Sequence, residues 1–213
     1  MSGLGLRPTL SSRVYFGQRL MRSKYVLVTV GLGGASSPWM MKAGMRQGHD
    51  LQVTLHKLNV SELAAILEQG NSFSALGFVH PGALLPPFVV SRALEMVFAG
   101  EPEQWWSPFL ILEGPEHAIV GGCAFKGQPK SGRVEVLYGV SKDCRGRGIA
   151  AAAVRALAAV AFAHGAVEVL AEIEPHNLAS IRVVEACGFD RLSERLAEDG
   201  KVVGQWLLFR TGA

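Results

Sequence analysis

The sequence predicts one domain of mixed α and β structure, an α+β fold built on a central, mostly antiparallel sheet flanked by helices. Hydrophobic residues make up 49% of the 213 residues, which is enough for one sizeable core. Runs with strand character outnumber the runs with helical periodicity. The resulting order, β-α-α-β-β-β-α-β-α-β-β, has three consecutive strands at its centre. It therefore does not fit a doubly wound sheet, in which strands and helices alternate.

The first half of this order begins with a strand and two helices. Residues 51–58 alternate as a strand, and residues 61–69 form a capped amphipathic helix that Gly70 ends. Residues 88–99 give the second helix. Three strands follow, at Phe109–Glu113, Ala118–Phe125 and Arg133–Val140. The two segments between them, E-G-P-E and K-G-Q-P-K-S-G, are rich in turn residues and short enough for hairpins.

The second half begins with a helix that is apolar on nearly every face. From Gly148 the sequence continues I-A-A-A-A-V-R-A-L-A-A-V-A-F-A, strong helix formers with one charge, Arg155, so we expect this helix to be buried. Residues 166–173 then alternate as a strand. A short helix follows, which Asn177 caps and Gly188 ends. Two strands, residues 190–195 and 202–210, close the domain.

The turn that precedes the buried helix has the composition of an anion site. Residues 134–150 read V-E-V-L-Y-G-V-S-K-D-C-R-G-R-G-I-A, so a strand runs into a basic, glycine-rich turn and then into a helix. The first N–H groups of a helix lack internal partners, and that end carries about half a positive charge. Glycines at this point let backbone donors approach a phosphate closely. The sequence therefore predicts phosphate binding here, with Arg145 and Arg147 adding positive charge.

Other interpretations of this turn exist. Gly146, Gly148 and Ala151 also satisfy the dinucleotide fingerprint G-x-G-x-x-G/A, with Glu168 or Glu172 roughly 20 residues further on. This alternative, a dinucleotide-binding oxidoreductase, is weaker because a polar segment separates the strand from the first glycine. A P-loop is excluded, since no Gly-Lys-Ser/Thr follows the glycines. A glycine turn that binds no ligand stays open.

Two segments of the chain together resemble a known family. Arg145-x-x-Gly148-x-Ala150 is similar to the Arg/Gln-x-x-Gly-x-Gly/Ala acyl-CoA motif of the GNAT superfamily of N-acetyltransferases. Asn177-x-x-Ser180, followed by Gly188-Phe189, resembles the second motif of that superfamily. The branch that includes the ribosomal-protein N-terminal acetyltransferases is the most similar. The resemblance covers residues 51–210 and implies the GNAT fold, in which the central strands splay apart.

The resemblance also implies acetyl-CoA as the cosubstrate. In the family the pantetheine arm pairs like an extra strand with the strand before the turn, and the pyrophosphate takes N–H groups from the turn. In this sequence the strand positions are Leu137, Tyr138, Gly139 and Val140. The turn positions are Arg145, Gly146, Arg147, Gly148, Ile149 and Ala150. Asn177 is expected to contact the pantetheine, to cap its helix, or to do both.

Acetyl transfer to an amine needs proton handling at two places. Glu135 occupies a position similar to that of a general-base glutamate in several family members, although it would equally suit a solvated residue or one that orients the acceptor. Many members carry a thiolate-protonating tyrosine where this chain has Val184. In the ribosomal branch a serine often takes that role, and Ser180 fits it. The sequence therefore predicts direct attack in a ternary complex. The missing tyrosine keeps a second hypothesis open, a non-catalytic acyl-CoA sensor.

The acceptor side is expected at residues 71–87 and at Trp105 and Trp106. These residues are mainly apolar and aromatic, with His80 as a polar handle and two carboxylates, Glu101 and Glu103, nearby. Because of this composition, a small apolar amine or an unblocked peptide N-terminus fits better than a polyanion or a polyamine. A Trp-Trp pair also suits a protein core. Homodimers are common in the family, but the sequence locates no interface.

Charge divides the chain into an arm and a domain. Residues 1–49 carry seven Lys or Arg and no Asp or Glu, whereas residues 50–213, the predicted single domain, have a net charge of −4. The basic arm therefore accounts for the overall +3, which argues against nucleic acid as a partner of the domain. The arm fits a flexible extension or a start site assigned too early, with Met40, Met41 or Met45 as the true start. It also fits a targeting peptide. Its apolar stretch is too short to span a membrane.

Cysteine and histidine usage indicates the compartment and the absence of a metal site. The three cysteines have no disulfide, redox or metal spacing, and the six histidines are scattered. We therefore expect no metal and a reducing, cytoplasmic location, or an organelle if the arm is a transit peptide. Cys144 lies in the predicted pyrophosphate turn, where a bystander thiol is the simpler interpretation.

Overall fold

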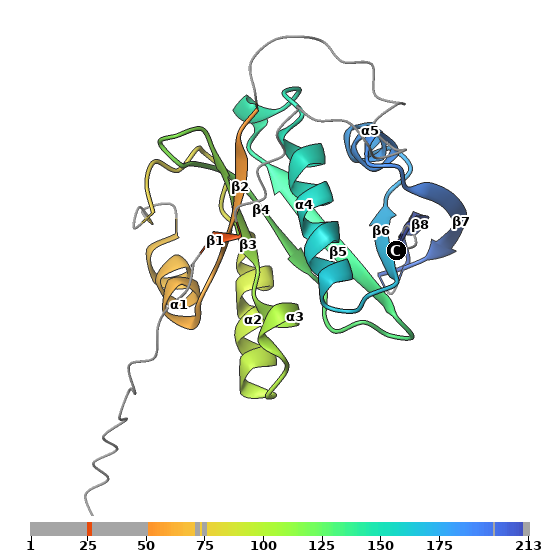
Figure 1. The fold of residues 1–213 in the computed structure, drawn as a ribbon, viewed down its shortest axis with the longest axis horizontal. Coiled ribbons are helices and arrows are strands. Elements are labelled where there is room, and N and C mark those ends of the chain that lie inside the picture. Colours follow the sequence, from red (N-terminus) through yellow and green to blue (C-terminus); the bar gives the residue numbers. More distant parts are fainter. Residues whose placement is uncertain (1–24, 27–50, 71–72, 74–75, 198, 211–213) are drawn as a thin grey trace, which may run out of the picture.

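The computed structural model describes residues 25–26, 51–70, 73, 76–197 and 199–210. The expectations about the basic arm lie outside the described residues, except that β1 (Tyr25–Val26) pairs antiparallel with β2 (Val53–Lys57). Eight strands form a sheet in the order β1-β2-β3-β4-β5-β6-β8-β7 (Figure 1). The remaining strands are β3 (Phe109–Glu113), β4 (Ala118–Phe125), β5 (Arg133–Val140), β6 (Glu168–Ile173), β7 (Asp190–Leu196) and β8 (Val202–Phe209).

Five helices connect these strands within the described residues: α1 (Val60–Gln69), α2 (Pro87–Phe98), α3 (Glu103–Trp106), α4 (Ile149–Ala163) and α5 (Leu178–Ala186). The predicted order is confirmed, and β3, β4 and β5 have the predicted bounds. The sequence did not predict α3 or the 3₁₀ turn at Lys142–Cys144. Helix α1 begins one residue early because Asn59 and Glu62 form a capping box, in which each side chain accepts a hydrogen bond from the other's backbone N–H.

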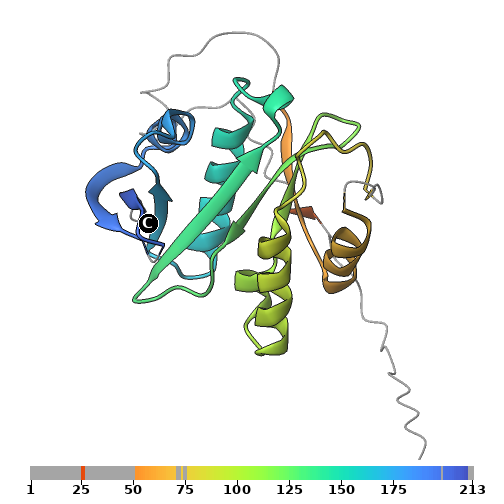
Figure 2. The ribbon, with the colours of Figure 1, turned by 180° about the vertical axis from the view of Figure 1, so that it is seen from behind.

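The sheet separates two hydrophobic cores. Alternate residues of a strand point to opposite faces, so Phe109 and Ile111 of β3 join the core under α4, whereas Leu110 and Leu112 join the core under α1 and α2. Figures 1 and 2 show α4 and α2 on opposite sides of the sheet. Eight of the fifteen residues of α4 are buried, which confirms the prediction of a buried helix. Within the described part of the chain, no helix is long and apolar enough to cross a bilayer.

The sheet splays between β5 and β6. The two strands pair in parallel over three residue pairs, Arg133 with Glu168, Val134 with Val169 and Glu135 with Leu170, and then separate. Beyond Glu135, β5 continues to pair with β4 on its other side, up to Val140. This is the one parallel pair among the described strands. The splay leaves one edge of β5 without a neighbouring strand from Val136 onwards.

Candidate functional site

The gap between the splayed strands contains a cavity of about 230 Å³. Residues from both strands and from α5 enclose it: Val136, Leu137 and Tyr138 of β5, Ala171, Glu172 and Ile173 of β6, and Glu174, Asn177 and Ser180 beyond β6, together with Lys126. Since one edge of β5 is open here, an extended chain lying in this gap can take its hydrogen bonds from β5 as a further strand would. Two of the four predicted strand positions, Leu137 and Tyr138, therefore meet Asn177 and Ser180 at one place, whereas Gly139 and Val140 do not line this cavity.

Close backbone approach shapes the same region. Gly121 of β4 lies opposite Val140, and a Cβ atom added to Gly121 would be 2.2 Å from the carbonyl oxygen of Gly139. No side chain fits there. The β4–β5 register runs unbroken through Gly139, so Gly139 marks no bulge, and the close approach of the two strands requires the glycine at position 121. A Cβ atom on Gly139 itself would meet nothing within 4 Å.

The turn after β5 is held in place by side chain to backbone hydrogen bonds. The buried Ser141 hydroxyl donates to the carbonyl of Pro81 at 2.7 Å, and the Arg145 guanidinium donates to the carbonyl of Val140 at 3.1 Å. Gly146 and Gly148 have φ values of 77° and 82°, which favour glycine strongly. These conformations direct the chain into α4, so the N–H groups of the first helical turn point out at this end.

Two of the predicted anion ligands already have partners within the protein. The backbone N–H of Arg145 donates to Lys142 at 3.3 Å, inside the 3₁₀ turn. Arg147 forms an ion pair with Glu113 of β3 at 2.5 Å, and its side chain is 53% exposed. The carboxylate of Glu113 partly offsets the charge that Arg147 contributes at the turn. An anion there would rely on the backbone from Gly146 to Ala150 more than on side-chain charge.

Asn177 and Ser180 begin α5 at the far wall of the gap. The Asn177 side chain accepts a hydrogen bond from the backbone N–H of Ser180 at 3.1 Å, so the predicted cap is present. Ser180 is half-buried and is one of the residues that line the cavity. Val184, in the position where many relatives carry tyrosine, is fully buried in the core under α4. A hydroxyl group does reach this region from β5, because Tyr138 also lines the gap.

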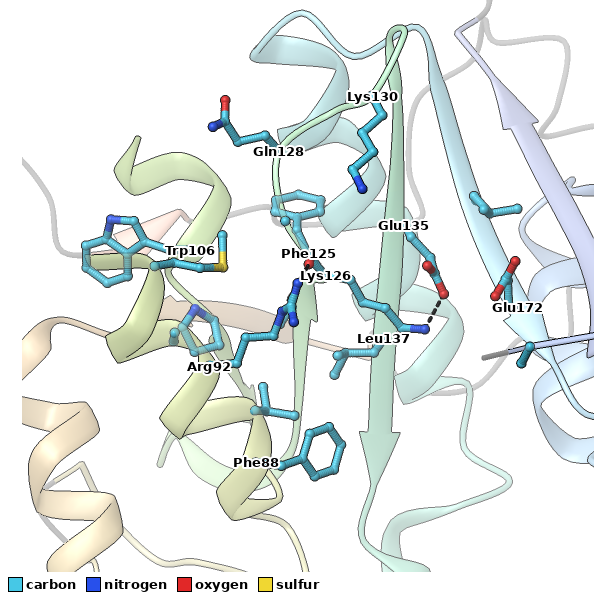
Figure 3. Close-up of a pocket in the computed structure, with 18 of the residues that line it drawn as sticks. Phe88, Arg92, Trp106, Phe125, Lys126, Gln128, Lys130, Glu135, Leu137 and Glu172 are labelled. Carbon is cyan, nitrogen blue, oxygen red and sulfur yellow. Dashed lines mark hydrogen bonds and ion pairs between the residues drawn. The ribbon is translucent and has the colours of Figure 1, made fainter. Parts of the chain in front are cut away.

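Glu135 points to the opposite side of the sheet from Tyr138, away from α4. Its carboxylate forms an ion pair with Lys126, the first residue after β4 (Figure 3). Glu172 of β6 faces the same side and is held by the Arg195 guanidinium at 2.5 Å and by Gln205 at 3.0 Å. Burial alone would raise the pKa of Glu172, but the hydrogen bonds from Arg195 and Gln205 outweigh it and keep that pKa below its ordinary value.

A second cavity, of about 1100 Å³, opens on this side of the sheet. Its wall formed by α2 and α3 is largely apolar and includes Phe88, Ala93 and Met96 of α2 and Trp106 of α3. The opposite wall is charged and includes Glu172, Glu174, Arg195, Asp199 and Lys201. Figure 3 shows Phe88 and Trp106 on one side and Glu135 and Glu172 on the other. The cavity suits a ligand with a charged head and an apolar body.

The predicted acceptor residues divide between this cavity and the core. Trp106 and Glu101 line the cavity. Trp105 is 5% exposed and packs edge-on against Phe125, so it belongs to the core, and Glu103 forms an ion pair with Lys57. Asn71, Ser72, Ser74 and Ala75 lie outside the described residues. The described part of segment 71–87, including His80, does not line the cavity, so the prediction of an acceptor wall there stays a prediction.

The structure also describes the acidic residues of the dinucleotide alternative, the thiol of Cys144, and the His, Cys, Asp and Glu side chains that could bind a metal. Glu168 forms an ion pair with Arg133, and Glu172 with Arg195, so both acidic residues of the dinucleotide alternative already have partners within the protein. Cys144 is 1% exposed, and burial, followed by the Glu113 carboxylate, raises the pKa of its thiol. Among the described residues, no three His, Cys, Asp or Glu side chains come together as metal ligands would.

Sequence reasoning missed Lys126, Arg195 and Phe88. Lys126 could have been found from the sequence, because the predicted hairpin between β4 and β5 places it opposite Glu135. In the structure the Lys126 N–H donates to the Glu135 carbonyl at 2.8 Å. Arg195 had none, since its approach to Glu172 depends on β8 lying between β6 and β7. Phe88 is the second residue of α2 and is 69% exposed, which a helical pattern alone does not indicate.

Comparison with known proteins bears on this geometry. The chain matches the family model of the acetyltransferase (GNAT) domain over residues 52–190. No curated protein sequence matches it. Solved structures similar to it include the ribosomal-protein-S5-alanine acetyltransferase from Vibrio fischeri, with a TM-score of 0.53, 18% identity, and coverage of 77% of this chain and 95% of that chain.

Two further structures share the fold. An aminoglycoside acetyltransferase in complex with coenzyme A matches with a TM-score of 0.52 and 21% identity, covering 75% of this chain and 95% of that one. A GNAT-family acetyltransferase from Bacillus anthracis matches with a TM-score of 0.51 and 15% identity, covering 74% and 94%. At these identities the structures support the fold alone. Together with the family match over most of the described domain, they show that the chain belongs to the GNAT acetyltransferase family.

Proposed function

We propose that this protein transfers an acetyl group from acetyl-CoA to a primary amine, by direct attack in a ternary complex. The observation that carries the proposal is that the two cavities meet. Lys126, Leu137, Glu172 and Glu174 line both the gap between β5 and β6 and the larger cavity beside α2. A donor lying in the gap and an amine lying in the larger cavity would therefore be neighbours, as attack without a covalent enzyme intermediate requires.

The residues of the gap and the turn fit an acyl-CoA. The open edge of β5 at Leu137, Tyr138, Gly139 and Val140 is suited to the amide groups of pantetheine, and Asn177 lies at the opposite wall. The backbone from Gly146 to Ala150 is suited to the pyrophosphate, with Arg145 and Arg147 beside it. When bound, the thioester supplies the activated acetyl group.

Glu135 and Ser180 are proposed for the two proton transfers. A free alkylammonium has a pKa near 10.4, so the acceptor must lose a proton before it can attack. Glu135 stands in the larger cavity with its carboxylate held by a lysine ammonium, as it would be by an acceptor ammonium, and can accept that proton directly or through a water. The Ser180 hydroxyl lines the gap and can donate to the departing thiolate.

The larger cavity supports an amine that carries an apolar group, such as a small apolar amine or a peptide N-terminus. The apolar wall at α2 fits the body of such a molecule, and the carboxylates of Glu135 and Glu172 fit its ammonium. A second candidate function is an acyl-CoA sensor that binds the cosubstrate without turnover, because the buried Val184 takes the place of the usual tyrosine.

Calorimetric titration with acetyl-CoA, with NAD and NADP in parallel, tests the cosubstrate. Gly148→Glu should abolish acetyl-CoA binding, because it forces a bulky anion into a left-handed position at the turn. Gly165→Glu is the matched control: its φ of 91° imposes similar strain, but at the opposite end of α4. Binding of a dinucleotide in place of acetyl-CoA would overturn the proposal. Binding without release of CoA thiol in the presence of amines would favour the sensor.

A further inference from the structure

We propose that Lys126 is itself an acceptor and that the protein acetylates this lysine in its own active site. The inference rests on the proposed function, since it uses the same donor and the same base. Lys126 lines both cavities and therefore stands where the gap for the donor opens into the cavity for the acceptor. No other lysine of the described residues lines both.

The backbone of Lys126 is held beside this junction. Its N–H donates to the carbonyl of Glu135 at 2.8 Å, which continues the β4–β5 ladder by one residue. Its carbonyl accepts two hydrogen bonds from the Arg92 guanidinium of α2, at 3.1 and 3.3 Å. The hairpin and a helix therefore hold Lys126 from two sides. Figure 3 shows its side chain crossing β5 and ending at the carboxylate of Glu135.

The ammonium of Lys126 already makes the contact that an external amine would need. It is ion-paired with Glu135, the proposed base, and Glu172 faces the same junction. A long, half-exposed lysine side chain has enough rotamers to swing from the larger cavity into the gap. An amine tethered beside the donor also reacts without the entropy loss of bringing in a second molecule.

The chemical step is balanced by acetyl-CoA alone. Glu135 takes one proton from the Lys126 ammonium, and the freed Nζ lone pair attacks the thioester carbonyl. The carbon–sulfur bond breaks as the new carbon–nitrogen bond forms. The amine loses two protons in all: one ends on the CoA sulfur, so that CoA leaves as the thiol, and the other passes to solvent, which leaves Glu135 as the carboxylate again. The products are Nζ-acetyl-lysine, CoA thiol and one proton, and no oxidant or reductant is needed.

Acetylation would change the site that performs it. An amide carries no charge, so acetylated Lys126 cannot form an ion pair with Glu135. Before modification, the lysine ammonium competes with an incoming amine for the same carboxylate. After modification, the carboxylate is available to the acceptor. Self-acetylation would therefore irreversibly remove the positive charge that competes with the acceptor for the Glu135 carboxylate.

The test is site-resolved mass spectrometry on the full-length protein incubated with acetyl-CoA. Lys57 is the internal control: it forms an ion pair with Glu103 at 2.9 Å and has a side-chain exposure of 35%, against 45% for Lys126, but it lines neither cavity. We expect Lys126 to gain an acetyl group more than about tenfold faster than Lys57. The rate per molecule should not depend on protein concentration, and Gly148→Glu should remove the difference between the two lysines. Lys126→Arg should remove the rapidly acetylated position and leave the slow acetylation of Lys57 unchanged.

Three outcomes would overturn the inference: equal rates at Lys126 and Lys57, a fast reaction that survives Gly148→Glu, or a rate that rises with protein concentration. Calorimetric binding of acetyl-CoA and release of CoA thiol with benzylamine are measured on the same sample. If acetyl-CoA binds and benzylamine releases CoA while Lys126 reacts no faster than Lys57, self-acetylation fails and the proposed function stands. If acetyl-CoA does not bind, both fail together.

Discussion

Tyr138 and Ser180 join the two walls of the gap between β5 and β6. The Tyr138 hydroxyl, on β5, donates a hydrogen bond to the backbone carbonyl of Ser180, on α5, at 3.1 Å. Burial raises the pKa of Tyr138 to about 12. A phenol with so high a pKa is a weak proton donor near neutral pH, since efficient general acids have a pKa close to the working pH. We therefore regard Tyr138 as a link between β5 and α5 and not as a replacement for the tyrosine missing at Val184.

Tyr138→Phe should leave the rate of acetyl transfer within about threefold of wild type, while lowering the free energy of unfolding by about 1 kcal/mol, the typical net value of one hydrogen bond. The measurements are kcat with a saturating amine and urea unfolding at neutral pH. A fall in kcat of two orders of magnitude with unchanged stability would instead make Tyr138 the proton donor.

The raised pKa of Tyr138 also predicts how stability depends on alkaline pH. In the unfolded chain the phenol ionises near its ordinary pKa of 10.0, whereas in the folded protein it ionises near 12. The folded state thus holds the proton more tightly, so this contribution is fully present below pH 10 and is lost as the pH rises toward 12. Urea unfolding across this range should show wild type losing stability more steeply than Tyr138→Phe. Parallel curves would contradict the assignment.

Gly121→Ala should destabilise the fold by about 1 to 3 kcal/mol, because its Cβ atom would lie 2.2 Å from the Gly139 carbonyl oxygen and force β4 from β5. Acetyl-CoA affinity should fall with it, since β5 forms one wall of the gap. Gly139→Ala is the matched control on the facing strand, where a Cβ meets no atom within 4 Å. Urea unfolding and calorimetry compare the two variants, and equal destabilisation would refute the close approach.

Glu135→Gln should lower kcat by about 100-fold with little change in acetyl-CoA affinity, because a general base typically contributes that much and the residue faces the acceptor side. Glu172→Gln removes a neighbouring carboxylate that already has Arg195 and Gln205 as partners, so we expect a smaller loss. Steady-state kinetics and calorimetry separate the two effects. An unchanged kcat in Glu135→Gln would remove this residue from the mechanism.

Ser180→Ala and Asn177→Ala should differ in which quantity they change. The helix cap uses the backbone N–H of Ser180, so Ser180→Ala keeps the cap and should lower kcat without loss of stability. Asn177→Ala removes the capping oxygen and should cost about 1 kcal/mol of unfolding free energy. Thermal or urea unfolding and kinetics on both variants test this. If Ser180→Ala turned over at the wild-type rate, another group would have to protonate the thiolate.

Much of the fold follows from local sequence patterns. The bounds of β4 and β5 could be predicted because runs with strand character end at turn-rich segments on both sides. The start of α1 was placed one residue late because Asn59 lies before the amphipathic run, and its role depends on Glu62 reaching back. Leu137, Tyr138, Asn177 and Ser180 line one cavity as expected, since the order of elements brings β5 beside β6.

The acceptor side could not be predicted in the same way. Trp105 and Trp106 are adjacent in sequence, yet the four-residue helix α3 sends one into the core and the other to the cavity. So short a helix has too few residues to show a period. The pairing of Arg195 with Glu172 arises from strands 23 residues apart that meet only through β8. Such contacts depend on sheet order, which local alternation does not contain.

The short pairing between β5 and β6 also affects how the molecule holds together. Strands β1 to β5 and strands β6 to β8 are two half-sheets that share only three residue pairs at their seam, with α4 packed across them. A ligand that fills the seam would act as a missing strand and join one half-sheet to the other. Its binding free energy would then be free energy of folding as well, because only the closed sheet offers both walls. In this protein, binding a ligand between β5 and β6 and keeping the two half-sheets folded together would therefore be thermodynamically linked.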